Sequence, residues 1–318
     1  MLERLKHMRG KTGLSRSRVG AQISAGPLEQ MPNGHDRLLF SYTSEQDSRL
    51  RRLAMRTVER VTGQPKLKRM YLRNQSHPVP GESFWQAAIR MLGLRLHYDR
   101  DALAAAPSTG PLVLVANHPF GVVDGLVIGY LAEQLRPDFK ILANSVLYRA
   151  PEMRDYILPI DFDPTPGAQQ LNLRSRAEAA NWLGDGHCLV VFPGGTVSTA
   201  PKPFARRAVD PDWKPYTARL VRRAKATVLP VFFAGQNSRL FQIASHVSYS
   251  LRLSLLFHEV RNKIGADLAI AIGAPIPPAA IAQMRDNREL TAHLRDSTYC
   301  LQRALPWTPR DRLQRRIA

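Results

Sequence analysis

The sequence is short of cysteine, of acidic side chains and of long apolar segments, and each shortage narrows the class of protein. Its two cysteines, Cys188 and Cys300, provide neither a disulfide framework nor a Cys-x-x-Cys pair for zinc, so we expect a reducing compartment. No segment contains the roughly 18 uncharged apolar residues that a transmembrane helix needs. The basic start of the chain lacks the apolar stretch of a secretory signal peptide, so any membrane contact is expected to be peripheral.

The shortage of acids leaves the chain strongly basic. Lysine and arginine number 45 against 26 aspartates and glutamates, which gives a formal charge of +19. Such a charge predicts a polyanionic partner: an anionic lipid surface, an acidic carrier protein or a nucleic acid. Nucleic acid is not expected, because the sequence contains no nucleic-acid-binding motif and its basic residues are not interleaved with stacking aromatics.

The 318 residues, 44% of them hydrophobic, are enough for one large domain with extensions. Composition predicts a basic, disordered arm at 1–36, an amphipathic helical extension facing a membrane at 37–105, the main domain at 106–305 and a basic tail at 306–318.

Two amphipathic helices are predicted in the extension. The first, over 44–62, has an apolar stripe and is otherwise covered by arginines. A basic linker at 66–73 separates it from a second helix over 83–94, which carries Trp85 on its apolar face. Both helices are expected to lie on an anionic bilayer, with a plainly solvated basic face as the alternative for the first.

The main domain alternates between short apolar runs and helical patterns. Strands are expected at 111–116, 139–143, 157–161, 188–192, 227–233 and 267–272. Helices are expected at 123–135, 168–184, 213–225, 238–260 and 287–304. Near-continuous apolar strands separated by helices predict an α/β fold, with a largely parallel central sheet flanked by helices.

A polar motif follows the first of these strands. The run Asn-His-Pro-Phe-Gly-Val-Val-Asp occupies 117–124, where an α/β protein places reacting groups. His118 would act as a general base, and Asp124 would fix its tautomer. On a straight helix a six-residue offset turns the side chains about 240° apart, but Pro119 and Gly121 indicate a turn that brings them together. The alternative is a structural core histidine beside a helix-capping aspartate.

A second motif, Phe-Pro-Gly-Gly-Thr-Val-Ser at 192–198, follows the strand at 188–192. Consecutive glycines let backbone N–H groups approach an anion, and Thr196 and Ser198 add hydroxyl donors. The spacing is not that of a Walker A loop. The alternative is an ordinary turn after a buried strand.

In this order, and about 75 residues apart, the two motifs resemble those of the glycerophosphate and lysophospholipid acyltransferase superfamily. Leu-Pro-Val at 229–231 resembles its last short motif. The variant Asn-His-Pro-Phe-Gly-x-x-Asp-Gly at 117–125, with Gly-Gln-Asn-Ser at 235–238 after the last strand, is most similar to the bacterial branch that carries a hemolysin label and includes ornithine-lipid acyltransferases. The resemblance covers roughly 85–275 and makes 106–305 an acyltransferase domain.

The resemblance implies an acyltransferase without metal or cofactor. His118 would activate the hydroxyl of a lyso-lipid, and Asp124 would orient the histidine. The hydroxyl would attack a thioester of CoA or of acyl carrier protein, which serves as co-substrate. The predicted substrate contacts are Asn117, Gly121, Arg149, Arg174, Pro193, Gly194, Gly195, Thr196 and Ser198.

The sequence departs from the family pattern in three places. Five residues, not four, separate the histidine from the aspartate, and Gly194 stands where the family has glutamate. Phe162 stands where a phosphate-binding arginine is usual; Arg149 or Arg174 would replace it, unless both are surface arginines. A lyso-lipid without a free phosphomonoester, such as lyso-ornithine lipid, is therefore favoured as acceptor.

The sequence thus predicts a peripheral O-acyltransferase of membrane lipid biosynthesis at the cytoplasmic face of the inner membrane. Its expected partners are anionic membrane lipids, the lyso-lipid acceptor, and acyl carrier protein or a CoA thioester. The alternative is a non-catalytic, basic membrane-binding protein of the same fold.

Overall fold

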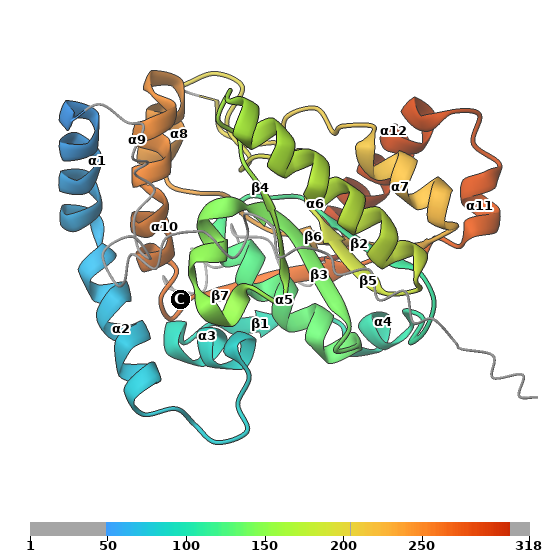
Figure 1. Ribbon diagram of the computed structural model, residues 1–318, viewed down its shortest axis with the longest axis horizontal. Helices are drawn as coiled ribbons and strands as arrows, with labels where there is room; N and C mark the ends of the chain where they lie inside the picture. Colours follow the sequence, from blue (N-terminus) through green and yellow to red (C-terminus); the bar gives the residue numbers. More distant parts are fainter. Residues whose placement is uncertain (1–48, 204, 306–318) are drawn as a thin grey trace, which may run out of the picture. The chain divides into compact units, whose positions relative to one another are not determined.

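A seven-stranded sheet in the order β1-β7-β6-β2-β5-β3-β4 forms the centre of the structure (Figure 1). The computed structural model describes residues 49–203 and 205–305; the predicted arm (1–36) and tail (306–318) lie outside this part. The strands are β1 (Arg95–His97), β2 (Leu112–Ala116), β3 (Phe139–Asn144), β4 (Ile157–Ile160), β5 (Cys188–Val191), β6 (Thr227–Phe233) and β7 (Asp267–Ile272).

The sheet is largely parallel, as the sequence predicts. β2 pairs in parallel with β5 and β6, β5 with β3, and β3 with β4. β7 runs antiparallel to β6, and β1 pairs in parallel with β7. All six predicted strands are present. β1 was not predicted, because its three residues alternate between half-buried and exposed and contain no apolar run.

Helices cover both faces of the sheet. They are α1 (Arg49–Thr62), α2 (Gln64–Ser76), α3 (Phe84–Leu92), α4 (Arg100–Ala104), α5 (Val122–Leu135), α6 (Pro166–Gly184), α7 (Tyr216–Ala224), α8 (Arg239–Val247), α9 (Tyr249–Ser254), α10 (Leu256–Asn262), α11 (Pro278–Ala282) and α12 (Asn287–Cys300). Three 3-10 turns are η1 (Ser145–Arg149), η2 (Pro151–Met153) and η3 (Leu301–Ala304).

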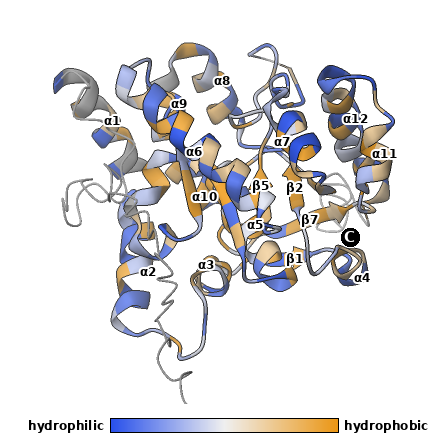
Figure 2. Cartoon of the chain, turned by 45° about the vertical axis from the view of Figure 1, so that its right-hand side comes forward, coloured by the Kyte–Doolittle hydropathy of each residue, from blue (hydrophilic) through white to orange (hydrophobic). Residues whose placement is uncertain are grey.

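The central strand β2 shows how the two faces are built. Leu112 and Leu114 pack in the core with α3, α5 and α10, whereas Val113 and Val115 pack in a second core with α6, α7 and α12. Alternate side chains of a strand point to opposite faces, so an unbroken apolar run is covered on both sides. Figure 2 shows these hydrophobic strands between helices whose outer faces are hydrophilic. Each such fully buried side chain contributes roughly 1.5–3 kcal/mol to folding.

Three predicted segments differ from the structure. The helix expected over 238–260 is divided into α8, α9 and α10; Ser248 adopts an extended backbone (φ −159°, ψ 133°) between α8 and α9, and α9 ends at Ser254 before α10 begins at Leu256. The linker expected at 66–73 lies within α2, which starts with a proline in its first turn and buries Leu67 in the core. The helix expected over 287–304 ends at Cys300 and continues as η3.

The predicted extension is built into the fold. β1 belongs to the sheet, and α3 packs on α5 with Trp85 fully buried. The indole lies on Gly129 of α5, where an added Cβ would be 2.3 Å from two of its ring atoms. The expectation that the Trp85 face lies on a bilayer is therefore wrong, because this face is part of the core. In the described part of the chain, no helix combines the length and the apolar composition needed to span a bilayer.

Candidate active site

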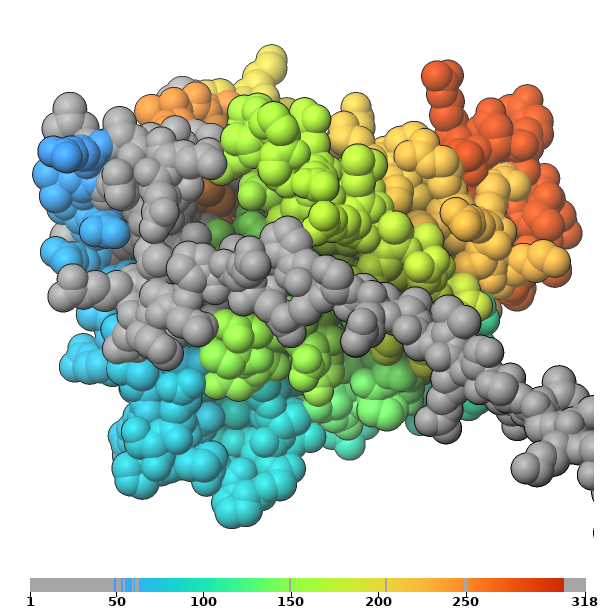
Figure 3. Space-filling model, in the orientation of Figure 1, coloured from blue at the N-terminus to red at the C-terminus, as the bar shows by residue number. Residues whose placement is uncertain are grey.

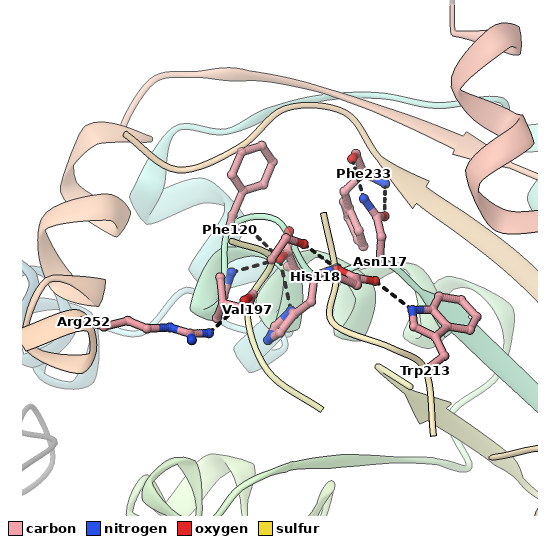
Figure 4. A network of polar contacts seen from close by, with 11 residues as sticks. Asn117, His118, Phe120, Val197, Trp213, Phe233 and Arg252 are labelled. Carbon is pink, nitrogen blue, oxygen red and sulfur yellow. Dashed lines mark hydrogen bonds and ion pairs between the residues drawn. The ribbon is translucent and has the colours of Figure 1, made fainter. Parts of the chain in front are cut away.

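The first motif leaves the carboxyl end of β2 as a fixed loop (Figure 4). Asn117 is buried, and its side-chain amide forms two hydrogen bonds with the backbone of β6, as the backbone of a neighbouring strand residue would. Its amide nitrogen donates to the carbonyl of Phe233 at 3.0 Å, and its amide oxygen accepts from the N–H of Phe233 at 2.7 Å. These bonds tie the loop to the end of β6. Asn117 thus positions the next residue, His118, and both groups of its amide are engaged within the protein.

The structure brings His118 and Asp124 together. Nδ1 of His118 lies 3.1 Å from Oδ2 of Asp124, and the same oxygen accepts hydrogen bonds from the N–H groups of Phe120 (2.7 Å) and Gly121 (2.9 Å). Gly121 has φ 77°, a conformation that glycine adopts without strain, and it turns the chain into α5. The turn therefore overcomes the six-residue offset. Asp124 both caps α5 and contacts the histidine, so the two alternatives from the sequence are combined in one side chain.

Burial dominates the electrostatics of this pair. It raises the pKa of Asp124, while the contacts with His118 and with the N–H groups of Phe120 and Gly121 act in the opposite direction. Burial also lowers the pKa of Lys263, whose Nζ lies 4.2 Å from the ring centroid of Phe120. The His118 ring stacks on Phe192 with centroids 4.1 Å apart, so its plane is held from one side.

Asp210 joins the two motifs, and no motif of the sequence predicted this role. Its Oδ1 accepts from the N–H of His118 at 3.1 Å and from the hydroxyl of Ser198, and its Oδ2 accepts from the indole N–H of Trp213 at 2.9 Å. Ser198 also donates its N–H to the carbonyl of His118 at 2.8 Å. Ser198 is buried and directed at Asp210, so it braces the histidine loop.

The glycine pair shapes the floor of the site. Gly195 has φ 76° and donates its N–H to the carbonyl of Phe192 at 2.9 Å, which closes the turn after β5. A Cβ at Gly194 would lie 3.2 Å from Cβ of Asp210. The space beside residue 194, where the family has glutamate, therefore already contains the carboxylate side chain of Asp210.

A cavity of about 630 Å³ opens at this floor. Both motifs contribute to its lining, with His118, Gly121, Pro193, Gly194, Gly195 and Thr196. Its remaining walls are mainly apolar side chains from α2, α3, η1 and α10, among them Leu67, Met91, Leu147 and Phe257. The side chain of His118 is 18% exposed, so the ring reaches the cavity while Asp124 behind it is fully buried.

Of the two arginines predicted to replace the phosphate-binding arginine of the family, only Arg174 has a described side chain. Arg174 is exposed on α6 and lies away from the cavity lining, and the side chain of Arg149 lies outside the described part of the chain. Arg176, Lys214 and Arg252 line the cavity instead. Arg176 is two residues from Arg174 on α6, and two residues correspond to about 200° around a helix, so only one of the two arginines lines the cavity. Arg252 donates to the carbonyl of Val197 at 2.8 Å (Figure 4).

A histidine and a buried carboxylate at the end of a parallel strand, beside a deep apolar cavity, suit acyl transfer to a hydroxyl on a lipid. The sequence model of the acyltransferase family matches residues 39–307, and the chain belongs to this family. The predicted membership of the glycerophosphate and lysophospholipid acyltransferase superfamily is thereby confirmed, and the protein is an acyltransferase.

Two relatives of the chain are both named lyso-glycine lipid O-acyltransferase. The protein from Bacteroides thetaiotaomicron is 24% identical over 235 residues, which cover 72% of this chain and 83% of the relative. The protein from Phocaeicola vulgatus is 23% identical over 239 residues, 73% of this chain and 82% of the relative. The crystal structure of the 1-acyl-sn-glycerophosphate acyltransferase PlsC from Thermotoga maritima aligns with 84% of this chain and 86% of its own, at 17% identity and a TM-score of 0.44.

Proposed function

We propose that the protein transfers a fatty acyl chain from an acyl thioester to the free hydroxyl of a lyso-lipid, as a step of membrane lipid biosynthesis. The observation that carries this proposal is that His118 lines a mainly apolar cavity together with the loop of the second motif. The volume of about 630 Å³ is typical of a pocket that encloses a small-molecule ligand. Apolar walls from several helices suit an acyl chain, and the histidine is placed where its reacting end would lie.

The proposed chemistry begins at His118. Nδ1 faces Asp124, so Nε2 is the nitrogen that accepts the proton of the acceptor hydroxyl. The hydroxyl oxygen attacks the thioester carbonyl carbon and forms a tetrahedral intermediate. The carbon–sulfur bond then breaks, and the imidazolium returns the proton to the leaving thiolate. The products are the acylated lipid and a free thiol. General base catalysis of this kind contributes about 10²–10⁴-fold to the rate.

The floor of the cavity is proposed to hold the oxyanion of the intermediate. Gly194 and Thr196 line the cavity, as His118 does. Backbone N–H groups and a hydroxyl are the donors that such a charge requires. Gly195 would contribute the shape of the turn, since its N–H is bonded to Phe192.

The acceptor is proposed to be a lyso-lipid whose headgroup carries a carboxylate, such as a glycine or ornithine lipid. Two observations support this choice. Arg176 and Lys214 provide cationic side chains at the lining of the cavity, and arginine matches the geometry of a carboxylate. Both relatives are named for lyso-glycine lipid. Phe162, in place of the arginine that the family uses for phosphate, also lines the cavity and disfavours a phosphomonoester.

The donor is proposed to be acyl-CoA or acyl carrier protein at the cytoplasmic face of the inner membrane. Both donors are anionic, and the formal charge of +19 would attract them. The thioester is the only co-substrate in this proposal.

Lipidomics tests the proposal. Cells that express the chain are supplied with lyso-glycine lipid, lyso-ornithine lipid or lysophosphatidic acid. The wild type is expected to produce a diacylated amino-acid lipid that is absent with His118→Ala. His77→Ala, at an exposed histidine away from the cavity, is the matched control and should retain full production. Equal production by His118→Ala would refute the mechanism. No product from a folded wild type with any acceptor would favour a non-catalytic lipid-binding role.

A further inference from the structure

α8 presents a stripe of apolar side chains to solvent. Leu240, Ile243 and Val247 are 52%, 42% and 72% exposed. At 100° per residue these three positions fall within about 60° of the helix circumference, so they form one continuous surface. The helix does not need them for packing, since Phe241 is the side chain that anchors it in the core. A contiguous exposed apolar surface of this kind indicates a contact with a partner or a membrane.

The basic helix α1 lies near α8. α9 packs against both α8 and α1, and Figures 1 and 2 both place the three helices at one end of the structure. In Figure 3 the orange surface of the α8–α9 segment and the blue surface of α1 occupy that same end. On α1, Leu53 is a further apolar side chain with a large exposed fraction, 64%.

The described exposed charges near the stripe are those of arginines. Arg239 is exposed on α8 itself. Arg49, Arg56 and Arg60 are exposed on α1. Among the described side chains of α1, α8, α9 and α10, the single acid is Glu259, which is buried and accepts hydrogen bonds from Ser238. An apolar stripe with exposed arginines on its own helix and on α1 is complementary to an anionic bilayer, where basic residues bind headgroups and apolar ones enter the interface.

The helices that follow α8 contribute to the wall of the cavity. Arg252 and Leu253 of α9 and Leu256 and Phe257 of α10 line it. Since α9 packs on α8, the stripe is connected to the cavity wall through one intervening helix.

We propose that Leu240, Ile243 and Val247 of α8 insert into the interface of an anionic bilayer, with Leu53 and the arginines of α1 at the headgroups. The inference rests on the proposed function, because a lyso-lipid acceptor is the reason for the enzyme to dock there. Vesicle binding is measured without donor or acceptor, so a failure of docking and a failure of acyl transfer are distinguishable.

The test is cosedimentation of the purified full chain with vesicles of about 30% phosphatidylglycerol in phosphatidylcholine. The triple variant Leu240→Ser, Ile243→Ser, Val247→Ser is expected to bind at least tenfold more weakly than the wild type. Leu173→Ser is the matched control, because Leu173 is 65% exposed on α6 and belongs to no such stripe. It should bind like the wild type. Turnover of a short-chain, water-soluble acceptor should be unchanged in both.

Three results would overturn the proposal. The triple variant could bind vesicles as well as the wild type, or Leu173→Ser could weaken binding equally. Light scattering could also show a wild-type dimer that the triple variant loses, which would make the stripe an interface between copies. If the triple variant unfolds, vesicle binding is measured on Arg239→Glu instead. Position 239 is in the first turn of α8, where a carboxylate interacts favourably with the helix dipole, so this variant is expected to fold. This variant is expected to lose binding to anionic vesicles severalfold, and unchanged binding would contradict the docking surface.

Discussion

Replacing Asp124 with asparagine separates the shape of the histidine loop from its charge. Oδ2 of the carboxylate is shared by three groups: the N–H groups of Phe120 and Gly121 and Nδ1 of His118. An asparagine oxygen at the same place can still accept from the backbone N–H groups, so the turn survives. It carries no charge, however, and its amide hydrogens would favour the wrong histidine tautomer if the group flips.

The expected size of the effect follows from these contacts. Loss of the orienting charge should lower kcat/KM by about 10²–10⁴-fold, or roughly 3–5 kcal/mol of transition-state stabilisation. The free energy of unfolding should change by no more than about 1 kcal/mol. A fully buried carboxylate, whose pKa burial raises, is replaced by a neutral group of the same shape, so the lost attraction to His118 is offset by the avoided cost of burying charge.

The assay is thiol release from an acyl thioester in the presence of saturating lyso-lipid, with urea unfolding measured on the same samples. Asp101→Asn, in the exposed first turn of α4, is the control and should leave both quantities near the wild type. Activity of Asp124→Asn within about threefold of the wild type would refute the view that His118 depends on this carboxylate. A collapse of stability together with activity would show that Asp124 serves the fold alone.

Two stability predictions follow from other parts of the structure. Gly129→Ala should cost about 1–3 kcal/mol in urea unfolding, because the new Cβ would lie 2.3 Å from the buried Trp85 ring. Gly125→Ala on the same helix, with nothing within 4 Å of its Cβ, should instead stabilise by about 0.5–1 kcal/mol, and equal effects would contradict the packing. Arg136 and His187 lower the pKa of Asp138 to about 2 from 3.8. The contribution of Asp138 to the free energy of unfolding is therefore complete above its pKa in the unfolded chain, and it is lost as the pH falls through its pKa in the folded protein. With its side chain 30% exposed, Asp138→Asn should cost about 1–2 kcal/mol at pH 7 after solvent screening and about half of that at pH 3, and a pH-independent cost would contradict this ion pair.

Local sequence signals predicted six of the seven strands of the sheet, because each of the six contains an apolar run of its own; β1 contains none. β2, β5 and β6 are covered on both faces, so nearly all of their consecutive residues are apolar and can be recognised as a run in the sequence. The turn that joins His118 to Asp124 was equally local, since Gly121 and the helix start are within the same eight residues. Helix breaks without glycine or proline were not predictable in this way. The extended backbone of Ser248 divides α8 from α9 without such a signal.

The two motifs, the basic charge and the parallel sheet were thus determined by the sequence alone, because each depends on neighbouring residues or on simple sums. The tertiary structure decided which distant groups meet. It placed Asp210 between the two motifs, turned Arg176 rather than Arg174 toward the cavity, and buried Trp85 against Gly129. These outcomes depend on helix phase and on packing between segments far apart in the chain. No local pattern encodes them, because burial against a partner is a property of the pair.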